Sequence, residues 1–102
     1  MDIATKKNGD TLYIKISGAV DESSTEKLRA ELNKIAFGKP TKVVMDLSLV
    51  PTIGSSGIGK ILLFYKSLES IRSQFEIKGI QDNLHRLFKS VKLDKLFPIS
   101  PA

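Results

Sequence analysis

The segment Asp46–Gly59 holds the residues of this chain whose types and spacing are best suited to chemistry. Two adjacent serines, Ser55 and Ser56, stand directly before an amphipathic helical pattern. The first turn of a helix leaves backbone N–H groups unpaired and carries the positive end of the helix dipole, which favours a phosphate. A serine at such a helix start could be a cap, a ligand for an anion or a phosphorylation site.

Glycine recurs around these serines, at Gly54, Gly57 and Gly59. A glycine inside a helix costs about 1 kcal/mol relative to alanine. We therefore expect another group to approach the backbone closely at this segment.

Two enzyme motifs nearly fit the same segment. Gly54–Lys60 matches the G-x-x-x-x-G-K pattern of a phosphate-binding P-loop, but Ile61 occupies the position of the Ser or Thr that would hold magnesium. A serine-hydrolase elbow, G-x-S-x-G, counted from Gly54, places Ile58 where its last glycine belongs. The sole histidine, His85, is the only candidate base. We expect no enzyme, and a nucleotide-binding module on Gly54–Lys60 remains one alternative.

The composition of the chain limits the kinds of protein and of binding site that it can form. A chain of 102 residues forms one domain, residues 1–102, and 41% apolar residues suffice for one core. With no cysteine and one histidine we expect no metal site, and we expect no cofactor. No leader-like segment and no apolar run of about 20 residues is present, so we expect a cytoplasmic protein without a membrane span. The net charge of +5 favours acidic partners weakly, and its scattered lysines lack the aromatic platform of a specific nucleic-acid site.

Strand and helix patterns alternate in the first half of the chain. Apolar residues alternate with polar ones from Leu12 to Ile16, which predicts a strand, and the turn dipeptide Asn8-Gly9 predicts an antiparallel partner before it. Ser23 and Glu26 have the spacing of a capping box, which predicts a helix over residues 24–37. Gly38 and Pro40 end this helix.

The second half continues the alternation around the serine loop. Residues 42–47 contain a continuous apolar run, typical of a central strand covered on both faces or nearly so. Helical periodicity predicts a helix over residues 56–72, and residues 75–80 read as another strand. Asp82 is the expected cap of a third helix, followed by a tail that contains proline. Strands alternating with helices predict an α/β fold with a mixed, mostly parallel sheet, and ligands usually dock at the carboxyl ends of its strands.

The serine loop also carries a family resemblance. Asp46-Leu47-Ser48, followed by Ser55-Ser56-Gly57-Ile58-Gly59, resembles the signature of STAS domains and in particular of bacterial anti-sigma factor antagonists, an Asp-Leu-Ser strand end followed by Asp-Ser-Ser-Gly-Leu-Gly. Ser17–Asp21 is similar to the family's Gly-Glu-Leu-Asp stretch before the first helix. The segment Lys92–Ile99 is similar to its closing Gly-Leu-Asp-Lys-Ile-Phe segment, so the resemblance covers essentially the whole chain.

This resemblance implies a regulatory protein with a single STAS domain. Unphosphorylated members bind an anti-sigma factor that is a serine kinase and thereby free a sigma factor, and a phosphatase resets the phosphorylated form. By position, the phosphoacceptor is Ser55, with Ser56 as the alternative acceptor and as a possible helix cap. The residues expected to contact the partner are Asp21, Asp46, Gly54, Ser56, Gly57 and Ile58. A monomer is the expected state of a domain this small.

One position departs from the family pattern. Gly54 stands where the family has an acidic residue directly before the acceptor, so a carboxylate that could position the hydroxyl or meet the kinase is missing. This departure keeps a second function open, a STAS scaffold or transport-accessory subunit that binds its partner without a serine switch.

Overall fold

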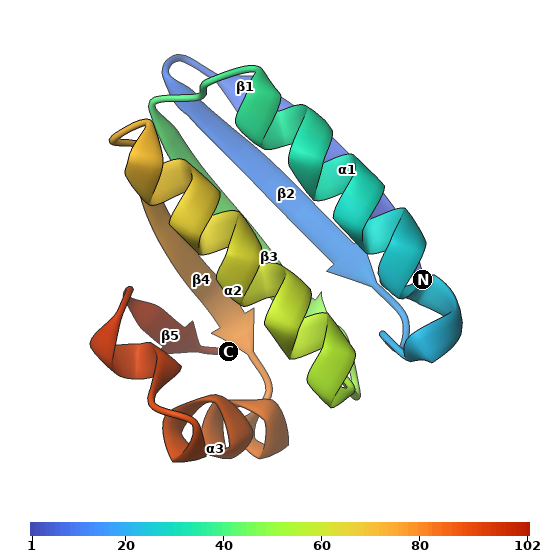
Figure 1. The fold of residues 1–102 in the computed structure, drawn as a ribbon. Helices are drawn as coiled ribbons and strands as arrows, with labels where there is room; N and C mark the ends of the chain where they lie inside the picture. The colour runs from blue at the N-terminus through green and yellow to red at the C-terminus, as the bar shows by residue number, and fades with distance from the viewer.

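The structure is a computed structural model that describes residues 1–102. One five-stranded sheet forms its centre (Figure 1). Its strands are β1 (Asp2–Asn8), β2 (Thr11–Ser17), β3 (Lys42–Leu49), β4 (Gln74–Ile80) and β5 (Ile99–Pro101). They lie in the order β1-β2-β3-β4-β5, with β1 antiparallel to β2 and all other pairs parallel. The mixed, mostly parallel sheet is therefore confirmed, and β5 occupies part of the tail for which no strand was predicted.

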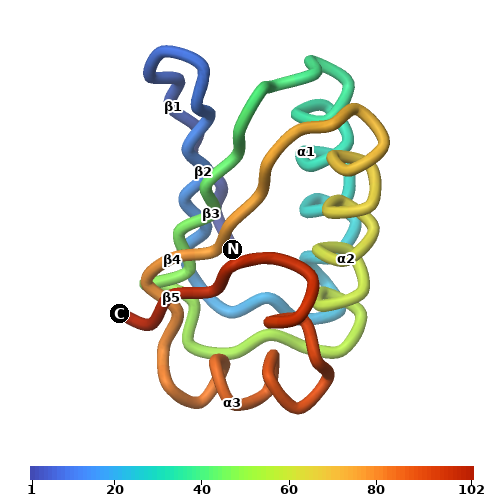
Figure 2. Tube along the Cα trace, turned by 90° about the vertical axis from the view of Figure 1, so that its left-hand side faces the viewer, coloured from blue at the N-terminus to red at the C-terminus, as the bar shows by residue number.

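Three α-helices accompany the sheet: α1 (Thr25–Phe37), α2 (Ser55–Ser70) and α3 (Asp82–Ser90). Short 3₁₀ turns cover Glu22–Ser24 and Leu93–Lys95. Helices α1 and α2 lie side by side on one face of the sheet, whereas α3 lies beyond the end of β4 (Figures 1 and 2). None of these helices combines the length and apolarity needed to cross a membrane.

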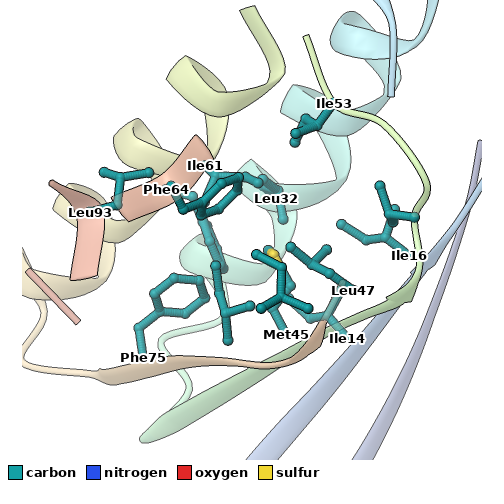
Figure 3. Packing of buried hydrophobic residues seen from close by; sticks show 14 of the residues in the cluster. Ile14, Ile16, Leu32, Met45, Leu47, Ile53, Ile61, Phe64, Phe75 and Leu93 are labelled. Atoms are coloured by element: carbon teal, nitrogen blue, oxygen red, sulfur yellow. The ribbon is translucent and has the colours of Figure 1, made fainter. Parts of the chain in front are cut away.

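The hydrophobic core fills the space between the sheet and the pair α1 and α2. It is one cluster of 20 buried residues. Leu32 from α1 and Ile61 from α2 point toward Met45 in the middle of the sheet (Figure 3). Burying an aliphatic side chain of this size contributes about 1.5–3 kcal/mol, so these residues help to hold α1 and α2 on the sheet.

The opposite face of the sheet carries no helix (Figure 2). Val44 on this outer face is nevertheless buried, with 4% of its surface exposed, in agreement with the prediction that β3 is covered on both faces or nearly so. Tyr13 and Glu76 flank it in register on the neighbouring strands, and Lys78 lies over the Tyr13 ring at 5.6 Å. Long polar and aromatic side chains thus cover Val44 in place of a helix.

The helix starts differ from those predicted. The capping box assigned to Ser23 and Glu26 is wrong, because Asp21 and Ser24 form the reciprocal pair and α1 begins at Thr25. Asp82 does not cap α3 but is its first residue, after Gln81. Several neighbouring polar side chains compete for the same N–H groups at each of these turns, and a residue pattern alone does not decide between them.

Candidate functional site

The serine loop ends at the first residue of α2. Gly54 is the N-cap, with φ −79° and ψ 166°, and Ser55 and Ser56 are the first and second helical residues. Neither serine side chain makes a capping hydrogen bond, so the expectation that Ser56 caps the helix is wrong. Ser55 is exposed and Ser56 is half-buried. The Ser55 hydroxyl is therefore presented to solvent with no partner in the chain.

The first turn of α2 has unpaired backbone donors. The N–H groups of Ser55, Ser56 and Gly57 donate to no acceptor in the chain, and Ile58 is the first whose N–H is bonded, to the Gly54 carbonyl at 3.1 Å. The first turn also contains no acidic residue. Free donors together with the positive end of the helix dipole stabilise an added negative charge, such as a phosphate on the neighbouring hydroxyl.

The loop before Ser55 is held by backbone hydrogen bonds to the segment that follows β2. The Val20 N–H donates to the Thr52 carbonyl at 3.0 Å, and the Gly54 N–H donates to the Val20 carbonyl at 2.9 Å. Val20 and Ile53 also form an isolated parallel bridge. This pairing places Asp21, the residue after Val20, beside the serine loop.

The close approach to the backbone that the glycines predicted occurs at Gly57. A Cβ atom at Gly57 would lie 2.8 Å from Val20 Cγ1 and 3.0 Å from Ile53 Cγ1. Gly57 is also buried, so its backbone touches the protein's own core. At Gly59, by contrast, a Cβ atom would meet nothing within 4 Å. The fold accounts for Gly57 and gives no internal reason for Gly59.

Helix α3 supports the serine loop from below (Figure 2). The Gln81 side chain donates to the Ser48 carbonyl at 3.0 Å, and the Asn83 side chain donates to the Pro51 carbonyl at 3.0 Å. Sequence reasoning missed both residues, because a surface amide next to a helix start carries no signal of a partner more than 30 residues away. Val20 and Thr52 were also missed, because they pair through backbone groups, and residue type does not reveal such a pairing.

Asp21 is an exposed carboxylate that organises the turn before α1. Its Oδ1 accepts a hydrogen bond from the Ser23 hydroxyl at 2.6 Å, and its N–H donates to Ser24 Oγ at 3.0 Å. The Ser23 hydrogen bond, aided by Ser24, lowers the pKa of Asp21 below its ordinary value despite partial desolvation. The side chain is thus a local structural anchor that stays charged at neutral pH and lies close to the loop.

Asp46 lies on the outer face of the sheet. Lys15 and Lys78 flank it in register, and its Oδ1 accepts a hydrogen bond from the Ser48 N–H at 2.9 Å. Partial burial raises the pKa of Asp46, but the Ser48 hydrogen bonds and the two lysines outweigh it and leave the pKa below its ordinary value. Asp46 has no hydrogen bond or ion pair to Gly54, Ser55 or Ser56, and its hydrogen bond to Ser48 makes it an anchor of the end of β3.

Helical geometry also bears on the nucleotide alternative. Residues 55–60 of the P-loop-like pattern lie within α2, whereas a P-loop wraps phosphates with the loop that precedes its helix. Ile58 is half-buried and packs against the core, and Lys60 lies on the second turn of the helix. His85 on α3 has no hydrogen bond to either serine. The segment therefore has the geometry of an exposed helix start and lacks that of a phosphate-wrapping loop.

Comparison with known proteins agrees with this geometry. The STAS domain family model matches residues 2–102. The anti-sigma-B factor antagonist of Listeria monocytogenes is 26% identical over 94 residues, which are 92% of this chain and 82% of that protein. The crystal structure of an anti-sigma factor antagonist from Mycobacterium paratuberculosis has a TM-score of 0.90 at 23% identity, over 99% of this chain and 86% of that chain. The Bacillus cell fate determinant SpoIIAA, solved in its phosphorylated form, has a TM-score of 0.78 at 18% identity, over 99% of this chain and 92% of that chain.

These similarities extend from the first strand to the last. The similar proteins are named as antagonists or as a cell fate determinant, in agreement with the prediction of a regulatory protein and no enzyme. The sheet order and the position of the three helices are those of a single domain with this fold. With its family model matched from residue 2 to residue 102, this chain belongs to the STAS domain family.

Proposed function

We propose that this protein is a cytoplasmic anti-sigma factor antagonist switched by phosphorylation. In its unphosphorylated form it binds an anti-sigma factor that is also a serine kinase, and this binding frees a sigma factor. The kinase phosphorylates Ser55, and a phosphatase restores the active form. The partner contacts the surface formed by Asp21, Gly54, Ser56 and Ile58, while Gly57 is buried beneath this surface against Val20 and Ile53, and Asp46 supports the end of β3.

One observation carries this proposal: Ser55 is exposed and unpaired at the first residue of a helix whose first three N–H groups are free. A kinase needs such an accessible hydroxyl. The phosphorylated product keeps its fold, because the helix start stabilises the added 1.5–2 negative charges, about the charge of a phosphate near pH 7.

The same charge acts against binding. At a packed interface the phosphate loses water or faces carboxylates of the partner, and both effects weaken the complex. A change of about 3–4 kcal/mol in the binding free energy separates bound from free by several hundredfold. This magnitude is sufficient for a switch.

Gly54 supports the second candidate, a STAS scaffold or transport-accessory subunit that binds its partner constitutively. The family's carboxylate before the acceptor is absent, and the first turn of α2 has no acidic residue. The two candidates differ in whether a charge at Ser55 changes partner binding.

A quantitative pull-down from lysate of the source organism tests the proposal. The baits are the wild type, Ser55→Ala, Ser55→Asp and a matched control, Ser100→Asp, which places the same charge on an exposed residue of β5. We expect a kinase-like anti-sigma factor to bind the wild type, Ser55→Ala and Ser100→Asp but not Ser55→Asp. A partner retained equally by all four baits would support the constitutive scaffold.

Phosphopeptide mapping tests the acceptor itself. Incubation with the captured kinase and ATP should phosphorylate Ser55 alone, and Ser55→Ala should abolish the modification. Phosphate found only on Ser56, or on no residue, would refute Ser55 as the acceptor.

A further inference from the structure

The two helices that cover the sheet leave a groove of about 460 Å³ between them on the solvent side. Arg29 of α1 and Lys60 and Lys66 of α2 line it, and the core residues Leu32 and Phe64 form its floor. Figure 1 shows α1 and α2 running side by side over most of their length. The residues of α2 that line the groove run from Lys60 to Ser70 and span about 16 Å, which accommodates about three turns of a partner helix.

The groove has a one-sided charge. Three cationic side chains line it and no carboxylate does. Arg29 shares its charge with Glu26 at 3.0 Å, whereas Lys60 and Lys66 have no carboxylate within 4.0 Å. Two uncompensated ammonium groups along one helix attract an acidic partner and repel a basic one.

An exposed leucine lies between the two lysines. Leu63 is three residues from each of them and has 58% of its surface exposed. Lys60 and Leu63 share one face of α2 because residues three apart are neighbours on a helix surface. An apolar side chain flanked by cations is complementary to an amphipathic helix whose apolar ridge is flanked by carboxylates.

We infer that this groove binds an acidic amphipathic helix of a protein partner. The groove begins one helical turn beyond the serine site, since Lys60 and Leu63, which line it, follow Ser56 at i+4 and i+7 along α2. A partner helix in the groove therefore leads to Ser55, where a phosphate would meet its carboxylates. The inference rests on the proposed function in one respect: it assigns this helix to the partner whose binding phosphorylation of Ser55 controls.

A peptide titration tests the groove without the partner. The probe is a fluorescein-labelled 15-residue helix with leucines along one face and glutamates on both flanks, and its matched control replaces every glutamate by glutamine. We expect the acidic peptide to bind at least about tenfold more tightly at low ionic strength, with the difference shrinking as salt is added. Its NMR chemical-shift changes should map to α1 and α2.

Charge reversal locates the effect. Lys60→Glu combined with Lys66→Glu should reduce binding of the acidic peptide to the level of the glutamine peptide. The matched control, Lys89→Glu with Lys95→Glu, makes the same charge change at exposed residues elsewhere and should retain most of the affinity. Leu63→Ser should weaken both peptides, and since Leu63 is exposed, the variant keeps the fold.

Three outcomes would overturn the inference. The acidic peptide could bind no better than the glutamine peptide, or its shifts could map to the outer face of the sheet. Alternatively, anionic phosphatidylglycerol vesicles could bind through Lys60 and Lys66 while the acidic peptide does not, which would make the groove a membrane contact. This assay contains no kinase, so its result is independent of the Ser55 pull-down. Either experiment can fail while the other succeeds, and the two proposals are therefore distinguishable.

Discussion

Gly57 and Gly59 lie one half-turn apart in α2, and the structure predicts opposite effects for alanine at these two positions. Both substitutions gain the higher helix propensity of alanine, about 1 kcal/mol. Only the Cβ atom at Gly57 meets neighbours too close to tolerate, at 2.8 Å from Val20 Cγ1 and 3.0 Å from Ile53 Cγ1. Both neighbours are buried and β-branched, so their side chains have little room to turn away.

The magnitude follows from the difference between the two variants. Overpacking a core costs about 1–3 kcal/mol, while the propensity gain is common to both and cancels. Gly59→Ala should therefore be more stable than the wild type by about 1 kcal/mol, and Gly57→Ala less stable than Gly59→Ala by about 1–3 kcal/mol. For a domain of this size each kcal/mol shifts the melting temperature by about 4–8 °C.

Thermal unfolding followed by circular dichroism measures this difference, with urea unfolding as an independent check. The double variant Val20→Ala with Gly57→Ala provides a control, because removing the clashing methyl groups should reduce the penalty of Gly57→Ala below its value in the wild-type background. Equal stability of Gly57→Ala and Gly59→Ala would refute the argument that the core of this protein, rather than a partner, requires Gly57.

Three further predictions concern single side chains. Gly54→Asp should raise the free energy of unfolding by about 0.5–1 kcal/mol in urea titrations, because a carboxylate at the N-cap complements the helix start and the nearest atom to its Cβ, the Val20 carbonyl oxygen, is 3.8 Å away. Asp46 has a lowered pKa in the folded protein, so its stabilising contribution is present above about pH 4 and is lost as pH falls through the folded pKa. The Asp46→Asn variant should therefore lose less stability than the wild type between pH 5 and pH 3, roughly the range in which carboxylates titrate. An equal loss of stability in both proteins would contradict this. Ser73→Ala should leave stability unchanged or raise it by up to about 1 kcal/mol in thermal melts, because the buried Ser73 hydroxyl has no hydrogen-bond partner, and a clear loss would reveal one.

Local signals predicted the elements that depend on neighbouring residues. Asn8-Gly9 marks the hairpin, and Gly9 indeed has a φ of +62° in the turn between β1 and β2. The apolar run of β3 reflects burial on both faces of the strand, and the helical period of α2 reflects burial against the core, so both are readable from spacing alone. Gly38 ends α1 where it was expected to.

Contacts between distant segments could not be predicted in this way. The pairing of Val20 with Ile53 joins residues that are far apart in the sequence, and neither residue type signals it. Strand β5 has three residues and its sequence contains a proline, so no alternating pattern is long enough to reveal it. Backbone hydrogen bonds join the residues that flank it, Pro98 and Ala102, to Ile77 and Ile80. The need for glycine at position 57 arises from this same pairing, which brings Val20 and Ile53 close to its backbone. The glycine pattern therefore indicated a close approach but did not identify the residues that approach.

The geometry of α2 constrains how a phosphate at Ser55 could act. The three free N–H groups of the first turn, the absence of an acidic residue there and the helix dipole all favour the phosphorylated state of the isolated protein. The Ser55 hydroxyl makes no hydrogen bond that a phosphate would break, so phosphorylation should not unfold the loop or α2. In the proposed switch, loss of partner binding would then arise at the interface, where a partner covers these donors and the phosphate faces its carboxylates. A switch of this kind leaves the antagonist folded and available to a phosphatase, and it depends on the partner's charge as much as on the serine.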